Sequence, residues 1–137
     1  AEFDKGKTLR QVIIAPTRLY VKPILAALKQ FTIKGMAHIT GGGITENVPR
    51  VLPENTVAQI DAKAWTMPKL FQWLQQAGNV EQQEMYRTFN CGIGMVVIIG
   101  KQDTDAVQQF LAEQGETVYR LGEIRERNGS EHQTQVA

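Results

Sequence analysis

Apolar and polar positions along the chain follow two periods, one typical of helices and one typical of strands. Apolar residues at helical spacing predict helices over residues 20–31, 68–77, 81–87 and 104–114. Runs of β-prone composition predict strands over residues 9–14, 33–40, 56–60, 93–99 and 117–125. Because strands and helices alternate, the pattern predicts an α/β fold in which helices are layered on a sheet.

The ends of these elements carry recognisable signals. Gly78 and Gly115 stand where the preceding helical patterns stop, and Asp103 or Thr104 is placed to begin the last helix. A short helix should follow the three glycines at 41–43 and end before Pro53. The run over 93–99 is apolar on both faces, which predicts a central strand that is covered on both sides.

The length of 137 residues fits one compact domain. We divide the chain into an N-terminal extension or linker strand at 1–14, a domain at 15–126 and a polar tail at 127–137. The tail has the composition of a terminus that frays. No internal repeat divides the chain further.

Composition and charge narrow the functional classes. The formal net charge is +1, which gives no reason to expect a nucleic acid or an anionic membrane as partner. The longest apolar runs, such as 95–99, are far shorter than a membrane span. A single cysteine, Cys91, excludes an intramolecular disulfide and suits a reducing compartment, so we expect a cytoplasmic protein.

Few residue types with reactive side chains are present, and most have a simple structural interpretation. Cys91 could act as a nucleophile with His38 as its base, but a buried and inert thiol is the more common situation. His38 and His132 lack the spacing of metal ligands, and no Cys/His cluster is present. We therefore expect no metal site in this chain.

The first segment with candidate chemistry is MAHITGGGITENVPRVLP, residues 36–53. Alternation along the strand places His38 and Thr40 on one face, beside Gly41, Gly42 and Gly43. Successive glycines let several backbone N–H groups point toward one anion. The alternative is a plain tight turn, but three glycines beside two polar side chains favour a phosphate or nucleotide site. The segment lacks the pattern of a Walker A loop.

The second segment is EMYRTFNCGIGMVVIIG, residues 84–100. Arg87 and Asn90 stand where a loop enters the apolar strand, and Gly92 and Gly94 allow close approach of the backbone. These glycines precede the strand, whereas a dinucleotide-binding fingerprint follows one. A surface charge and packing glycines explain the segment equally well, so both interpretations stay open.

Taken together, these segments resemble the C-terminal half of the aminoimidazole ribonucleotide synthetases, also called phosphoribosylformylglycinamidine cyclo-ligases. The resemblance covers most of residues 15–125 in the order of the family. Its matching stretches are APTRLYVKPIL (15–25), KGMAHITGGGITENVPRVLP (34–53), FQWLQQAGNVEQQEMYRTFN (71–90) and GIGMVV (92–97). Other ATP-dependent members of the superfamily look similar only in the glycine-rich segment.

The resemblance implies a three-layer α/β/α domain with a mixed sheet and partial ferredoxin-like topology. It implies ATP-dependent ring closure of formylglycinamidine ribonucleotide, in purine biosynthesis, by a full-length homodimer. ATP and Mg²⁺ would be held mainly by the N-terminal half of that protein, so the isolated fragment would bind neither and be inactive.

The resemblance also implies roles for individual residues. His38 would be a catalytic residue. Phosphate and substrate would be held by Thr40, Gly41, Gly42, Gly43, Asn47, Arg50, Arg87 and Asn90. Two alternatives stay open: a stand-alone phosphate-binding or interaction module, and the equivalent domain of another ATP-dependent member of the superfamily.

Overall fold

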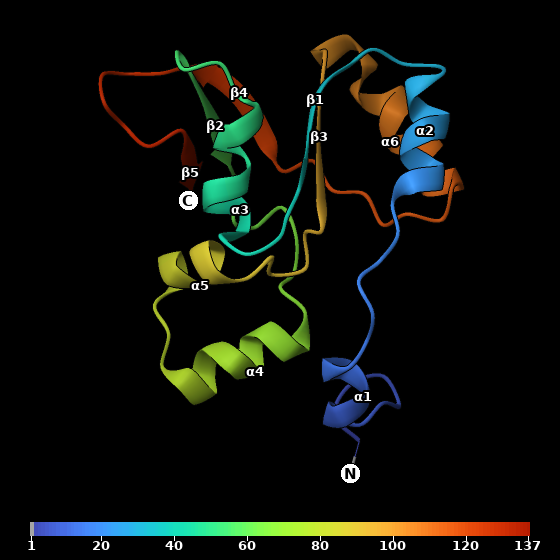
Figure 1. Ribbon diagram of the computed structural model, residues 1–137, viewed down its shortest axis with the longest axis vertical. Coiled ribbons are helices and arrows are strands. Elements are labelled where there is room, and N and C mark those ends of the chain that lie inside the picture. The colour runs from blue at the N-terminus through green and yellow to red at the C-terminus, as the bar shows by residue number, and fades with distance from the viewer. Residues whose placement is uncertain (1) are drawn as a thin grey trace.

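The computed structural model describes residues 2–137, and its helices and strands alternate along the chain (Figure 1). Residue 1 of the predicted 1–14 extension lies outside the described residues. The strands are β1 (Ile33–His38), β2 (Thr56–Ile60), β3 (Met95–Ile99), β4 (Gly122–Glu126) and β5 (Thr134–Val136). The α-helices are α1 (Leu9–Ile13), α2 (Val21–Leu28), α3 (Gly43–Asn47), α4 (Lys69–Gly78), α5 (Gln82–Thr88) and α6 (Thr104–Glu113). Two short 3-10 helices, η1 (Pro49–Val51) and η2 (Lys101–Asp103), complete the regular structure of this part of the chain.

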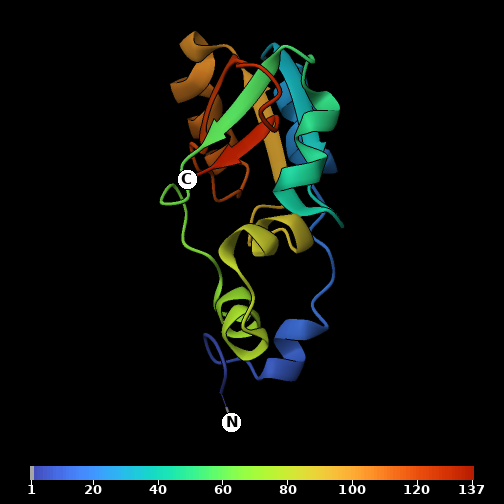
Figure 2. The same cartoon turned by 90° about the vertical axis from the view of Figure 1, so that its left-hand side faces the viewer.

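The strands form two sheets, and the predicted α/β class is confirmed. β1 and β3 pair antiparallel, with His38 opposite Met95. In the second sheet β2 lies between β4 and β5, antiparallel to β4 and parallel to β5, so this sheet is mixed as expected. The two views show α1 and α4 together at one end of the molecule, away from both sheets (Figures 1 and 2).

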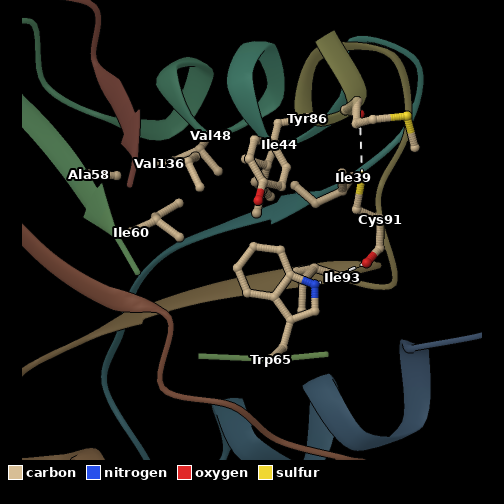
Figure 3. Packing of buried hydrophobic residues seen from close by; sticks show 12 residues of the cluster. Ile39, Ile44, Val48, Ala58, Ile60, Trp65, Tyr86, Cys91, Ile93 and Val136 are labelled. Atoms are coloured by element: carbon tan, nitrogen blue, oxygen red, sulfur yellow. Dashed lines mark hydrogen bonds between the residues drawn. The ribbon is translucent and has the colours of Figure 1, made fainter. Parts of the chain in front are cut away.

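The main core lies between the two sheets and is closed by α3 and α5 (Figure 3). Ile44 of α3, Met85 of α5 and Ile60 of β2 are buried in this cluster. The Trp65 indole donates a hydrogen bond to the Cys91 carbonyl at 2.9 Å, which satisfies its polar atom inside the core. A second, smaller cluster joins α2 and α6 to the opposite side of the β1–β3 pair through Ala27 and Val107.

The prediction of a central strand at 93–99 is wrong in its pairing. β3 pairs with β1 alone, and its five residues are all partly buried. Val96 packs against the main core while Ile99 packs against the α2–α6 cluster. The strand is apolar on both faces because a different cluster covers each face, and this does not require two neighbouring strands.

The β-prone run at 9–14 is helix α1, so the predicted linker strand is wrong. Thr8 and Gln11 form a capping box: the Thr8 hydroxyl accepts a hydrogen bond from the Gln11 N–H, and the Gln11 amide oxygen accepts one from the Thr8 N–H. α1 packs on α4, and the Phe3 and Trp73 rings meet edge-on at 6.0 Å. The Thr-x-x-Gln spacing at 8–11 was the signal in the sequence for this helix.

The predicted frayed tail at 127–137 contains strand β5 and is also corrected. Val136 and Thr134 are buried where β5 pairs with β2. The Arg125 guanidinium donates hydrogen bonds to both carboxylate oxygens of Glu131, at 2.7 and 2.9 Å. Polar composition concealed this strand because only alternate residues face the core. β4 begins at Gly122, so residues 117–121 of the predicted last strand are irregular.

The predicted helices are confirmed, with small differences at their ends. Asn79, not Gly78, takes the left-handed conformation that ends α4, with φ of 49°. Asp103 occupies the position before α6 but makes no capping hydrogen bond with its side chain. None of the helices formed by residues 2–137 is both long and apolar enough to cross a membrane.

Candidate functional site

A groove of about 620 Å³ lies at the C-terminal end of β1, and residues of α1 and α4 line it together with that strand end. Four chain segments that are far apart in sequence form its walls. They are residues 12–20, residues 38–41, the first turn of α4, and the loop at 88–94 between α5 and β3. This is where the structure brings both sequence-predicted segments together.

Four of the predicted site residues line the groove: His38, Thr40, Gly41 and Asn90. His38 is the last residue of β1 and its side chain is exposed, as is that of Thr40. The Asn90 side-chain oxygen accepts a hydrogen bond from the Gly92 N–H at 2.8 Å, which shapes the loop. Its amide nitrogen has no hydrogen-bond partner among residues 2–137, so it can donate to a ligand.

The glycine turn has the backbone conformation that the sequence suggested. Gly42 and Gly43 have φ of 98° and 58°, which side-chain-bearing residues rarely adopt. The Gly43 N–H, however, donates to the Thr40 carbonyl at 3.0 Å and closes the turn. A Cβ on Gly43 would overlap the Tyr86 carbonyl, so this glycine also lets the backbone of α5 approach. Gly41 alone of the three lines the groove.

Asn47, a predicted substrate-binding residue, is buried beneath the glycine turn. It is 4% exposed, and its amide nitrogen donates to the carbonyls of Thr40, Gly41 and Gly43 at 3.3, 3.2 and 2.8 Å. Asn47 therefore holds the glycine turn in place, and its contact with substrate stays a prediction.

The two predicted arginines lie beside the turn and outside the groove lining. The Arg87 Nε donates to the Glu46 carboxylate at 3.1 Å, and an Arg50 nitrogen donates to the Asn47 side-chain oxygen at 3.2 Å. Glu46 was missed from the sequence. Its other carboxylate oxygen is 2.7 Å from the position that a Cβ on Gly42 would take. An anion at this turn must therefore compete with Glu46 for Arg87.

Cys91 is a buried core residue, as the simpler interpretation expected. Its side chain is fully buried and its thiol contacts the Met85 carbonyl at 3.3 Å (Figure 3). Burial raises the pKa of the thiol from 9.0 to about 11, because the thiolate would lose its hydration. The nucleophilic thiolate is therefore scarce at neutral pH.

Sequence reasoning did not single out Arg18 and Tyr20, which form one wall of the groove. The Arg18 guanidinium pairs with the Glu116 carboxylate at 2.8 Å, and this partner raises the pKa of Arg18. The pKa of the Tyr20 phenol is raised mainly by burial and further by Glu116. Tyr20 was assigned to the apolar stripe of a helix. The signal for its real place was Gly94, whose missing side chain admits the Tyr20 hydroxyl.

The fold and the groove define an α/β domain that presents an imidazole, a hydroxyl and an amide beside a glycine turn. The family model described as AIR synthase related protein, C-terminal domain, matches residues 1–135. The chain belongs to this family, and the resemblance seen in the sequence is confirmed.

Curated relatives with high identity are named phosphoribosylformylglycinamidine cyclo-ligase. Those of Neisseria meningitidis (strain FAM18) and Neisseria gonorrhoeae are 84% and 82% identical over all 137 residues. The one of Chromobacterium violaceum is 66% identical over the same length. The chain spans about 40% of the length of these relatives and corresponds to their C-terminal part.

Proposed function

We propose that this chain is the C-terminal domain of an enzyme that closes the imidazole ring of aminoimidazole ribonucleotide, using formylglycinamidine ribonucleotide and ATP. The observation that carries the proposal is the 84% identity to a curated cyclo-ligase over every residue of the chain. The groove supports this proposal, because polar side chains from the segments 36–53 and 84–100 meet there, at the end of β1.

The chemistry of the reaction explains what such a groove must supply. The γ-phosphoryl group of ATP is transferred to the formyl oxygen, the amidine nitrogen attacks the formyl carbon, and the C–O bond breaks to release phosphate. The products are aminoimidazole ribonucleotide, ADP and phosphate. Phosphorylation turns a poor leaving group into a good one, so the protein mainly positions the reactants and stabilises negative charge.

We assign these tasks to the residues that face the groove. His38, Thr40 and Asn90 donate hydrogen bonds to the ribonucleotide phosphate or to the transferring phosphoryl group, and Gly41 admits the ligand close to the backbone. Arg87 and Arg50 add positive charge at the edge, where Glu46 and Asn47 orient them. The proton on the attacking amidine nitrogen is not assigned to any of these side chains.

ATP and Mg²⁺ are, in this proposal, held mainly by the N-terminal part of the full-length protein. Nowhere within residues 2–137 do three or more His, Cys, Asp or Glu side chains gather in a way that could hold a metal ion. No step of the reaction is therefore assigned to a metal held by this domain.

We further propose that the N-terminal part of the protein packs on the outer face of α2, and that the full-length protein is a homodimer. α2 buries Pro23 and Ala27 on its inner side. Its outer side exposes Val21, Leu25 and Leu28, which follow one another at helical spacing, and Leu19 beside them is 82% exposed. A contiguous apolar face of this kind is typical of a surface that another domain covers.

A chimera tests the function. Residues 1–137 replace the corresponding C-terminal part of the N. meningitidis cyclo-ligase, and ATP-dependent formation of aminoimidazole ribonucleotide is measured. We expect an active chimera and an inactive isolated chain. His38→Ala should lower kcat/KM of the chimera by about 100-fold or more, as loss of a well-placed donor does. The matched control is Lys101→Ala, in the exposed helix η2.

Two results would count against the proposal. A folded chimera without activity would contradict the assigned function. An active chimera in which His38→Ala keeps the parental kcat/KM would contradict the assigned site but leave the function standing.

A further inference from the structure

We propose that Tyr20 is a positioning residue that fixes the orientation of the His38 imidazole at the groove. The inference rests on the proposed function, in that His38 is taken to contact the ligand. It assigns a role to Tyr20, which lies in a stretch, 15–25, that matches the family but had no role assigned from the sequence.

Ring packing from Tyr20 supplies the orienting contact for the His38 side chain. The two ring centroids are 6.0 Å apart and the ring planes meet at 67°, an edge-to-face arrangement. Neither nitrogen of the His38 imidazole has a hydrogen-bond partner in the described part of the chain. Histidines in functional sites are commonly oriented by a hydrogen bond to one ring nitrogen. Here the orientation comes from the aromatic wall, so both nitrogens stay available to a ligand.

Tyr20 is itself held from two sides. Its hydroxyl lies over Gly94, where a Cβ would overlap it, so the tyrosine reaches from one wall of the groove to the loop before β3. Two residues earlier, Arg18 anchors the segment to the end of α6: its Nε pairs with the Glu116 carboxylate at 2.8 Å, and its Nη2 donates to the Gly115 carbonyl at 3.1 Å. The Tyr20 ring is thus held in one position on the side of the groove, whereas His38 is an exposed side chain at the end of a strand.

This arrangement predicts what happens when the wall is removed. Without the Tyr20 ring the imidazole gains rotational freedom, and the fraction of molecules with the productive orientation falls. Misplacement of a reacting group by about 1 Å can cost about 100-fold in rate. We therefore expect a loss in kcat and little change in KM, because the other polar groups that hold the ligand stay in place.

The contact is tested directly by NMR on the 137-residue chain. The sequence has two histidines, so the ring protons of His38 can be compared with those of His132, which lies outside the groove lining. Tyr20→Leu removes the ring current and should shift the His38 ring signals, whereas Tyr20→Phe should leave them near their original positions. His132 should not change in either variant. Unchanged His38 signals in folded Tyr20→Leu would refute the contact.

Gly94→Ala provides a second test that keeps the tyrosine. The added methyl group takes the space of the hydroxyl and pushes the ring away, so the His38 signals should move as they do in Tyr20→Leu. This backbone position has no left-handed φ, so alanine strains it only through that overlap. If Tyr20→Leu does not fold, Gly94→Ala decides alone: unmoved His38 signals in the folded variant would overturn the proposal.

Kinetics of the active chimera then separate positioning from stability. Tyr20→Leu should lower kcat about 10- to 100-fold with KM changed less than about threefold, and Tyr20→Phe should restore most of kcat. Tyr119→Leu, at an exposed tyrosine outside the groove, is the control. If His38→Ala lowers kcat and Tyr20→Leu does not, the positioning role is wrong while the proposed function stands. If the chimera is inactive, the proposed function fails and the NMR result still decides the contact.

Discussion

Replacing Gly43 with alanine should destabilise the domain far more than the same change at Gly41, two residues away. Gly43 has φ of 58° and its side-chain position is filled by carbonyls: a Cβ would overlap the Tyr86 oxygen and lie 2.7 Å from the Phe89 oxygen. Gly41 has no left-handed φ, and nothing lies within 4 Å of its Cβ position. Each variant adds one methyl group, which meets backbone carbonyls at position 43 and open space at position 41.

The expected cost at Gly43 has two parts. A side-chain-bearing residue in the left-handed region costs about 1–2 kcal/mol. Displacing the rigid backbone at the end of α5 is a case of overpacking, which costs about 1–3 kcal/mol. The sum is about 2–5 kcal/mol, a large fraction of the roughly 5–15 kcal/mol that stabilises a typical domain. At Gly41 we expect a change within about 0.5 kcal/mol.

Urea unfolding of the isolated chain, followed by tryptophan fluorescence, measures both free energies of unfolding. Trp65 reports on the main core, because it is buried there. Equal stabilities of Gly41→Ala and Gly43→Ala would refute the idea that close approach of α5, rather than ligand binding, requires glycine at 43. A selective loss at Gly43 would show that the turn is part of the packing of the domain.

Four further outcomes follow from the contacts. Asn47→Ala should lower the free energy of unfolding, measured with urea, by about 1–3 kcal/mol, because buried carbonyls lose their donor. A change below about 0.5 kcal/mol would contradict the role of Asn47 in holding the glycine turn. Cys91 should react with a thiol reagent only when the domain unfolds. Because burial raises the pKa of its thiol to about 11, the stability contributed by the buried, protonated thiol is complete below pH 9.0 and is lost as the pH rises toward 11. Fast labelling of the native chain at pH 8 would argue against this. Hydrogen bonds from Arg125 and the Asn128 N–H lower the pKa of Glu131 to about 2, so its contribution is present above pH 4.5 and lost as the pH falls toward 2. Glu131→Gln should make Tm fall less steeply between pH 5 and pH 2. An unchanged slope of Tm against pH would count against the ion pair between Arg125 and Glu131. Leu25→Ser should leave the isolated chain as stable as before but lower the Tm of the chimera. Equal Tm values for the chimera with and without this substitution would contradict the packing of the N-terminal part on α2.

Much of the fold could be predicted because its signals are local. The apolar stripes of α2, α4 and α6 and the β-prone runs of β1 and β2 lie within single segments, where side-chain spacing and turn residues act over a few positions. The errors arose where a signal was short or distant. α1 depends on a two-residue capping box, and β5 is a polar segment that becomes a strand only because β2 offers it an edge.

The sequence by itself determined which residues are chemically competent and that they come from two motifs, since residue type and alternation along a strand require no tertiary information. Tertiary structure alone decided which of them face the same groove. Asn47 and Gly43 became part of the framework because buried carbonyls surround them, while Tyr20 entered the site from a stretch to which the sequence assigned no functional role. The reason is physical: burial and hydrogen-bond satisfaction depend on neighbours that are distant in sequence, and they determine whether a polar side chain holds the protein together or stays available to a ligand.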